Sequence, residues 1–488
     1  MKNYEFWFIV GSQHLYGDEV LKIVEKRAKE MAFTINKNPS IPFKFIFKSI
    51  VKTSEDATKV IKEANYQDNC LGIITWCHTF SPSKMWINGL KLLQKPWCHL
   101  ATQYNKEIPN KEIDMDFMNL NQAAHGDREH GFIGARLRSK RKIIMGYWKE
   151  QEIINELGNW MRVAYAYYVS QNLKVCRFGD NMRNVAVTEG DKIEVQIKLG
   201  WQVNTWAVGD LVKEMNKVTA KEIDNQMKEY KKLYQFNTKK LDLVKYQAKE
   251  EIAIKKMLDK IGAKAFTNTF EDLYGMEQLP GIASQDLMRQ GYGYGGEGDW
   301  KVSAMTSIIK AMCAGLKGGT SFMEDYTYNL VKGKEFSLGA HMLEVCPSIA
   351  NKKPLIETHH LGIGMNQKDP ARLVFEGKPG KATVTSIVDM GGRLRMIVQD
   401  IEVVKSPYSM PNLPTARVLW KPYPSLKEGA KLWILAGGAH HTVLSMDATP
   451  TMLSDLADLF DIEFVHISKD TTYESLKNQL SLFDKTRG

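Results

Sequence analysis

The first 170 residues alternate short, continuously apolar runs with longer amphipathic segments. The apolar runs are Phe6 to Val10, Phe43 to Val51 and Leu71 to Trp76, and the amphipathic segments cover residues 15–36 and 54–66. Apolar strands that alternate with helices are typical of a parallel sheet covered on both faces. Ligands bind such sheets at the carboxyl ends of the strands. The first and third strands lead there into two polar loops, Gly11 to Tyr16 and Cys77 to Pro82.

A second alternating region begins near Leu173. Its predicted strands read "KVCRFG" and "VAVTE", and a capping box formed by Thr219 and Glu222 predicts the start of a helix. Residues 217–251 are helical in pattern, polar and highly charged, which predicts a solvated helical face.

After about residue 320 the pattern changes to strand-like runs separated by short turns. These runs are "ARLVFEG", "ATVTSIVDMGG", "RLRMIVQDIEVV" and "LWILAGG", and the Gly391-Gly392 pair predicts a hairpin. The predicted fold class is therefore α/β, with two N-terminal doubly wound parallel-sheet domains and a β-rich, barrel-like C-terminal domain. The domains are predicted at residues 1–172, 173–318 and 319–488, with a closing α/β piece from residue 440. Three domains fit a chain of 488 residues, at about 150 residues per domain.

Composition narrows the class of protein. A hydrophobic fraction of 43% and a charged fraction of 25% are those of a globular chain. No apolar run approaches the roughly 18 residues of a membrane span, and the first run is too short for a signal sequence. None of the six cysteines forms a C-x-x-C pair, so we expect buried thiols in a reducing compartment. We therefore expect a cytoplasmic protein without a membrane partner.

The net charge of +10 raises the question of a nucleic-acid partner. The 66 basic residues are interspersed with 56 acidic ones, and the densest basic run, Arg136 to Lys142, is typical of a solvated helix end or loop. Basic runs interleaved with aromatic residues, which a nucleic-acid surface needs, are not repeated along the chain. We expect no nucleic-acid partner.

Two glycine-containing segments lead into acidic residues. Gly291 to Gly296 fits G-x-G-x-x-G, but it follows a helical pattern rather than a strand, which argues against a dinucleotide loop. Glycines let the backbone approach a ligand, so Glu297 is either a surface acid or a carboxylate aimed at one. The second segment runs from Gly318 to Tyr326. Its acids, Glu324 and Asp325, lie among bulky apolar residues, where a buried carboxylate needs a partner or a metal.

The eleven histidines include two adjacent pairs, His359-His360 and His440-His441. The second pair follows "LWILAGG", so we predict it at the carboxyl end of a buried strand. His341 lies in an apolar segment and is either a core histidine or a ligand. No histidine shows a local metal-binding spacing such as H-E-x-x-H. A metal site would have to be assembled from distant parts of the chain.

From about residue 4 to about residue 470 the chain resembles the L-arabinose isomerase family. The resemblance rests on long segments in the same order: "FWFIVGSQHLYG", "HTFSPSKMWINGL", "IDMDFMNLNQAAHGDREHGFIGAR", "KVCRFGDNMRNVAVTEGDK", "FTNTFEDL", "QGYGYGGEGDWK", "GGTSFMEDYTY", "HMLEVCPSIA" and "LAGGAHHTV".

The resemblance implies a three-domain subunit related to L-fucose isomerase. It also implies a homo-oligomer, a hexamer with sites between subunits, and one divalent metal per subunit, usually Mn²⁺. The implied metal ligands are Glu297, Glu324, His341 and His441. The implied sugar contacts are Gln13, Leu15, Tyr16, His125, Met182, Phe270 and His440, with His125 reaching a neighbouring subunit's site.

The implied chemistry explains these residue types. An aldose and its ketose interconvert when a proton moves between C2 and C1 through an ene-diol, so Glu297 and Glu324 can divide the roles of base and acid. Which of them is the base at C2 stays open. The main alternative is a related ketol isomerase that acts on L-fucose or D-galactose, and a second is a sugar-binding or regulatory protein on a similar frame.

Overall fold

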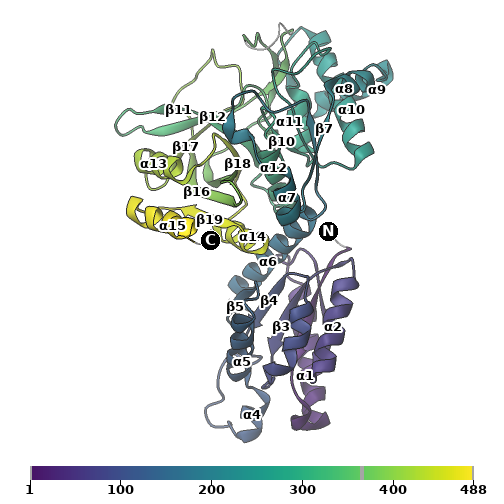
Figure 1. Ribbon diagram of the computed structural model, residues 1–488, viewed down its shortest axis with the longest axis vertical. Helices are drawn as coiled ribbons and strands as arrows, with labels where there is room; N and C mark the ends of the chain where they lie inside the picture. The colour runs from purple at the N-terminus through teal and green to yellow at the C-terminus, as the bar shows by residue number, and fades with distance from the viewer. Residues whose placement is uncertain (1–2, 363–367, 486–488) are drawn as a thin grey trace. The chain divides into compact units, whose positions relative to one another are not determined.

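The computed structural model describes residues 3–362 and 368–485, and the chain divides into two compact units, Met1–Tyr168 and Val169–Gly488. The first unit holds a five-stranded parallel sheet in the order β2-β1-β3-β4-β5 (Figure 1). Its strands are β1 (Glu5–Gly11), β2 (Lys44–Val51), β3 (Cys70–Cys77), β4 (Trp97–Ala101) and β5 (Lys142–Met145). Each predicted apolar run forms a strand, as expected.

Helices cover both faces of this sheet, which explains the continuous apolar runs. They are α1 (Gly17–Asn36), α2 (Ser54–Tyr66), α3 (Ile87–Leu92), α4 (Met115–Leu120), α5 (Ala123–Arg136) and α6 (Gln151–Ser170). Successive side chains of a strand point to opposite faces. In β1, Phe6 and Phe8 therefore pack in the core under α1 and α6, whereas Trp7 and Ile9 pack in the core under α2 and α3.

The second unit begins with another parallel sheet, in the order β10-β9-β6-β7. Its strands are β6 (Lys174–Phe178), β7 (Gln202–Trp206), β9 (Ala265–Thr267) and β10 (Gly293–Gly295). The helices of this region are α7 (Lys192–Leu199), α8 (Val208–Met215), α9 (Ala220–Leu233), α10 (Leu241–Ile261), α11 (Ile282–Arg289) and α12 (Trp300–Met312). The capping box of Thr219 and Glu222 begins α9, as predicted.

The predicted strand "VAVTE" is wrong. Residues Ala186–Thr188 form a short 3-10 helix, η3, within a loop. Side chains, rather than a neighbouring strand, form hydrogen bonds with the backbone here. Asn181 Nδ2 donates to the Thr188 carbonyl at 2.7 Å, and Lys301 Nζ donates to the same carbonyl at 2.8 Å. β-branched residues in a short run therefore gave a strand-like pattern without a strand partner.

The C-terminal part is built around a closed, six-stranded antiparallel barrel, as its β-rich pattern predicted. The barrel strands, in spatial order, are β15 (Gly380–Asp389), β18 (His441–Ser445), β11 (Thr320–Asn329), β12 (Phe336–Ala340), β17 (Val418–Pro422) and β16 (Leu394–Val404). Gly391 and Gly392, both at positive φ, join β15 to β16 in the predicted hairpin.

The predicted closing α/β piece is also present. After β18 it comprises α14 (Pro450–Phe460), β19 (Glu463–Ile467), which pairs in parallel with β16, and α15 (Tyr473–Lys485). A small separate sheet contains β8 (Gln235–Phe236), β13 (Leu355–Thr358) and β14 (Ala371–Val374).

The prediction of a strand at "LWILAGG" is wrong, because these residues end helix α13 (Leu426–Ala436). Ser425 caps its start and Gly437, in the left-handed conformation, ends it. Leu426, Gly429, Leu432 and Ala436 are buried at helical spacing, a period that the short apolar run alone does not reveal. His441 consequently lies at the beginning of β18, not after the end of a strand.

The predicted solvated face over residues 217–251 is partly wrong. Two helices, α9 and α10, are separated by β8, and each buries one side. Glu250 on α10 is fully buried, and neither of its carboxylate oxygens has a hydrogen-bond partner among the described residues. Burial, assisted by the charge of Glu277, raises the pKa of Glu250 well above its ordinary value of 4.5.

Glu250→Gln is expected to stabilise the protein at neutral pH. The folded state keeps the Glu250 proton above the ordinary pKa, at which the unfolded chain loses it, so the free energy of unfolding falls as the pH rises through this window. Glutamine does not titrate, so the variant keeps this part of its stability. Its free energy of unfolding should exceed that of the wild type by roughly 1.4 kcal/mol more for each pH unit above the ordinary pKa, while Glu250 stays protonated in the folded wild type. Thermal unfolding midpoints at pH 4 and pH 7 measure it, with the exposed Glu229→Gln as control. A midpoint difference that does not change with pH would contradict the assignment.

All six cysteines are buried and none is in a disulfide, as predicted. Within residues 3–362 and 368–485, no helix combines the length and apolar character that crossing a membrane requires.

Candidate active site

The register of the barrel brings one acid and two histidines together. Glu324 on β11 is paired with His441 on β18 and with Ala340 on β12. His341 directly follows Ala340, so it also lies beside Glu324. Three segments that are distant in sequence thus meet because antiparallel pairing fixes which residues are neighbours.

Glu297 comes from the parallel sheet of the same unit. It follows the carboxyl end of β10, while Phe270 and Met182 follow the carboxyl ends of β9 and β6, as the general rule for such sheets predicts. Glu297 has a φ of 59°, a conformation that costs energy for a residue with a side chain. The Met182 backbone amide donates to the Glu297 carbonyl at 2.9 Å and supports this loop.

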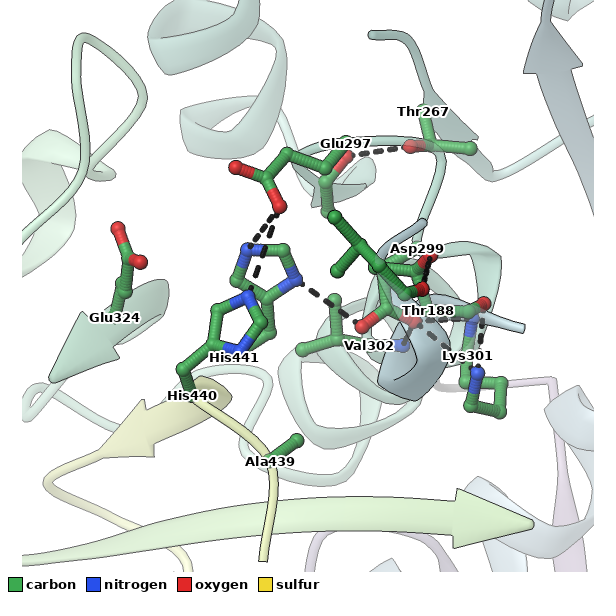
Figure 2. A network of polar contacts seen from close by, with 12 residues as sticks. Thr188, Thr267, Glu297, Asp299, Lys301, Val302, Glu324, Ala439, His440 and His441 are labelled. Atoms are coloured by element: carbon green, nitrogen blue, oxygen red, sulfur yellow. Dashed lines mark hydrogen bonds and ion pairs between the residues drawn. The ribbon is translucent and has the colours of Figure 1, made fainter. Parts of the chain in front are cut away.

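The carboxylate of Glu297 faces two adjacent imidazoles. Figure 2 shows its oxygen directed at His440 and His441, with distances from Oε2 to the two Nε2 atoms of 3.6 and 3.7 Å. Nε2 of His341 lies 4.0 Å from Glu324 Oε2. Potential ligand atoms of Glu297, His341 and His441 all lie within 4.8 Å of one another, as do those of Glu324, His440 and His441.

A buried carboxylate orients each of the two buried histidines. His441 Nδ1 lies 3.2 Å from Asp299 Oδ2, and His341 Nδ1 lies 2.5 Å from Glu344 Oε2. In both imidazoles the Nδ1 proton is thereby engaged and Nε2 is left to face the acids. This is the usual way in which proteins fix a metal-binding histidine.

The sequence reasoning did not single out Asp299 or Glu344. Glu344 follows His341 by three residues, a spacing that would have been a usable signal. Asp299 also caps helix α12 by accepting from the amides of Lys301 and Val302, so its sequence position indicates only a helix start.

Packing around the imidazoles fixes their planes. The Phe322 ring lies edge-on to His341 and His441, with centroid distances of 4.9 and 5.2 Å. Gly296 lies so close to His341 that a Cβ at this position would be 2.8 Å from the ring. A glycine is therefore required where the loop carrying Glu297 passes the imidazole.

The electrostatics indicate a site that needs positive charge. Burial raises the pKa of Glu297, but the adjacent His440 imidazole, 3.6 Å away, and the charges of His441 and His341 outweigh it and leave the pKa lowered. Burial lowers the pKa of His341, but Glu344 and then Glu324 outweigh it and raise the pKa to about 9. Burial and the charge of Glu324 raise the pKa of Asp325 to about 7.

The donor set fits a divalent ion. Nε2 of His441 is buried and has no hydrogen-bond partner among the described residues, although its ring is held by Asp299. Two carboxylates and two imidazoles, without a thiolate, suit Mn²⁺ or a similar ion. The family resemblance implies Glu297, Glu324, His341 and His441 as ligands; the first, third and fourth form one group of neighbouring ligand atoms, and Glu324 forms another with His440 and His441.

The predicted sugar contacts fall into two groups. The Phe270 ring is stacked with the His341 ring, with centroids 6.2 Å apart. The Met182 amide donates to the Glu297 carbonyl, and the His440 imidazole faces the Glu297 carboxylate. These three residues belong to the unit that carries the acids and histidines.

The other four predicted contacts belong to the first unit. Gln13 Nε2 donates to the Phe80 carbonyl at 3.4 Å, and the Phe80 ring stacks on His125 at 4.1 Å. Leu15 and Tyr16 lie in the neighbouring short helix η1 (His14–Tyr16), and the Leu15 side chain is 82% exposed. This loop region thus offers a polar and aromatic surface of its own.

Comparisons with known proteins cover nearly all of the chain. The L-arabinose isomerase N-terminal, central and C-terminal domain families match residues 1–172, 174–315 and 319–463. The chain is 54% identical to an L-arabinose isomerase of Clostridium beijerinckii over 481 residues, 98% of each chain. It is 51% identical to that of Geobacillus kaustophilus over 486 residues and 52% identical to that of Thermotoga neapolitana over 482 residues. Both alignments cover 98% of this chain and 97% of the relative.

Proposed function

The chain belongs to the L-arabinose isomerase family, and we propose that it interconverts L-arabinose and L-ribulose by moving a proton between C1 and C2 through an ene-diol. The observation that carries the proposal is the meeting of Glu297 and Glu324 around buried, oriented imidazoles. A passive sugar-binding protein has no need for such a costly group of buried charges.

Glu297, Glu324, His341 and His441 would hold one divalent ion per subunit, which we propose to be Mn²⁺. When bound, such an ion polarises the sugar carbonyl and stabilises the negative charge of the developing enolate. Asp299 and Glu344 hold the two imidazoles so that their Nε2 atoms face Glu297 and Glu324, where they would be free to bind the ion.

Glu297 and Glu324 also exchange the protons of the reaction. One carboxylate removes the C2 proton and returns it to C1, and the other serves the oxygens that gain and lose a proton. They are in different surroundings: Glu297 faces His440 and His441, whereas Glu324 lies beside His341 and Asp325. Different surroundings allow two acids to take different roles.

The sugar would be held by both groups of predicted contacts. Met182, Phe270 and His440 line the pocket from the chain that carries the acids. Gln13, Leu15 and Tyr16 contact the sugar as well, and His125 reaches the site of a neighbouring subunit in a homo-oligomer, which we propose to be a hexamer. We further propose three domains, at residues 1–172, 173–318 and 319–488, and a cytoplasmic location.

A panel of aldoses tests the substrate assignment. Ketose formation from L-arabinose, L-fucose and D-galactose is measured at equal concentrations, and L-arabinose is expected to give the highest kcat/KM. Some conversion of D-galactose is expected, because it shares the configuration of L-arabinose at C2 to C4. A higher kcat/KM for L-fucose or D-galactose would assign the protein to another substrate.

A further inference from the structure

A second cluster of potential metal ligands lies in the first unit, and none of its three residues belongs to the acid–histidine site. Cys77 ends β3, His99 lies on β4 and Asp127 lies on α5. One ligand atom from each lies within 4.8 Å of the other two. Cys77 and His99 are buried, and the Asp127 side chain is 17% exposed, which leaves access from solvent.

Close packing holds the three elements together. Thr75 and His99 are paired between β3 and β4, and Cys77 follows Thr75 on the same face of the strand. Helix α5 passes over Cys77 at Gly126, where a Cβ would lie only 2.6 Å from the Cys77 Cβ. The glycine brings Asp127 to the sulfur and the imidazole.

A network of buried polar side chains holds the elements around His99 in place. The Ser83 hydroxyl donates to the Ser81 carbonyl and lies 3.3 Å from Nδ1 of His130. Nε2 of His130 lies 3.2 Å from the Thr75 hydroxyl.

The Thr75 hydroxyl joins the strands beside His99. It donates to the Cys98 carbonyl at 3.5 Å, accepts from the indole of Trp97 at 2.9 Å and lies 2.9 Å from Nδ1 of His99. Nε2 of His99 lies 2.9 Å from Asp127 Oδ1. These contacts fix the plane of the His99 ring and direct its Nε2 at the carboxylate.

The Cys77 sulfur completes a group of three potential ligands with this imidazole and carboxylate, and Cys77 and His99 are buried. A thiolate, an imidazole and a carboxylate are the ligands of zinc and related ions.

We propose that Cys77, His99 and Asp127 form a binding site for a zinc-class cation, separate from the acid–histidine site, with solvent as the fourth ligand. The thiol proton of Cys77 leaves to solvent when the ion enters, and His99 binds it through Nε2 as a neutral imidazole. The ion links β3, β4 and α5. Because α5 also carries His125, it fixes the start of the helix that bears a proposed sugar contact.

Co²⁺ is a suitable probe, because only a bound thiolate gives it a strong near-ultraviolet charge-transfer band. Metal-free full-length protein is titrated with Co²⁺, and the band is expected in the wild type and in Glu297→Gln, which impairs the other site. It should be absent from Cys77→Ser and retained in Cys176→Ser, a matched change at another buried cysteine. Asp127→Asn should bind Co²⁺ about 10- to 100-fold more weakly.

Zn²⁺ should abolish the band by displacing Co²⁺ from the wild type. A folded wild-type protein without the band at saturating Co²⁺ would overturn the proposal, as would a band that survives Cys77→Ser. If Cys77→Ser does not fold, the wild-type spectrum and the Asp127→Asn titration still decide the question.

Discussion

Replacing either Glu297 or Glu324 with Gln is expected to lower kcat by roughly 10²–10⁴-fold, the usual contribution of a positioned acid or base. Each glutamate serves twice, since it would both hold the metal and transfer a proton. Glutamine keeps the size of the side chain but removes the charge and the ability to accept a proton. Ketose formation from L-arabinose at saturating Mn²⁺ measures the loss.

The matched control is Glu402→Gln, an exposed glutamate on barrel strand β16. It should leave kcat nearly unchanged. Metal content, measured on the same samples, separates the two roles: a variant that retains Mn²⁺ but not turnover has lost the proton transfer. Near-normal kcat in either Glu297→Gln or Glu324→Gln would contradict the assignment of that residue.

Mixing two inactive variants is expected to restore activity if sites are shared between subunits. His125→Ala would damage the contribution of the first unit, and Glu324→Gln that of the barrel. In a mixed oligomer, some sites combine an intact first unit from one chain with an intact barrel from another. Random mixing would give roughly a quarter of the wild-type sites.

The experiment requires that the two variants be unfolded and refolded together or co-expressed, so that subunits exchange. Each variant treated alone is the control and should remain inactive. Recovered activity would support shared sites and, with the mass of the assembly, the proposed hexamer. Mixed oligomers of verified composition without recovery would place the whole site within one chain.

The parallel-sheet parts of the fold were predictable because their signals are local. Phe6 to Val10 is continuously apolar since both faces of β1 are covered, and Thr219 with Glu222 marks a helix start by two hydrogen bonds. The segment "LWILAGG" failed as a strand because five apolar residues fit a buried strand or a buried helix equally well. The helix is recognisable only from the spacing of buried residues over the longer segment that begins at Leu426, and from the capping residues Ser425 and Gly437.

The site was predictable in its residue types but not in its assembly. No spacing in the sequence shows that Glu324 and His441 are neighbours, since that follows from the pairing of β11 with β18. The resemblance to a known family supplied the four ligands together. Asp299 and Glu344 were missed because a capping residue and a buried acid three positions from a histidine have many ordinary structural roles.

The most direct test of the account is the metal dependence of L-arabinose isomerisation. Purified protein is stripped with a chelator, its metal content is verified, and ketose is measured before and after Mn²⁺ is added. The account predicts no ketose from the stripped protein and its return with Mn²⁺, because the facing carboxylates and imidazoles need the cation. Undiminished ketose formation by verified metal-free protein would contradict it.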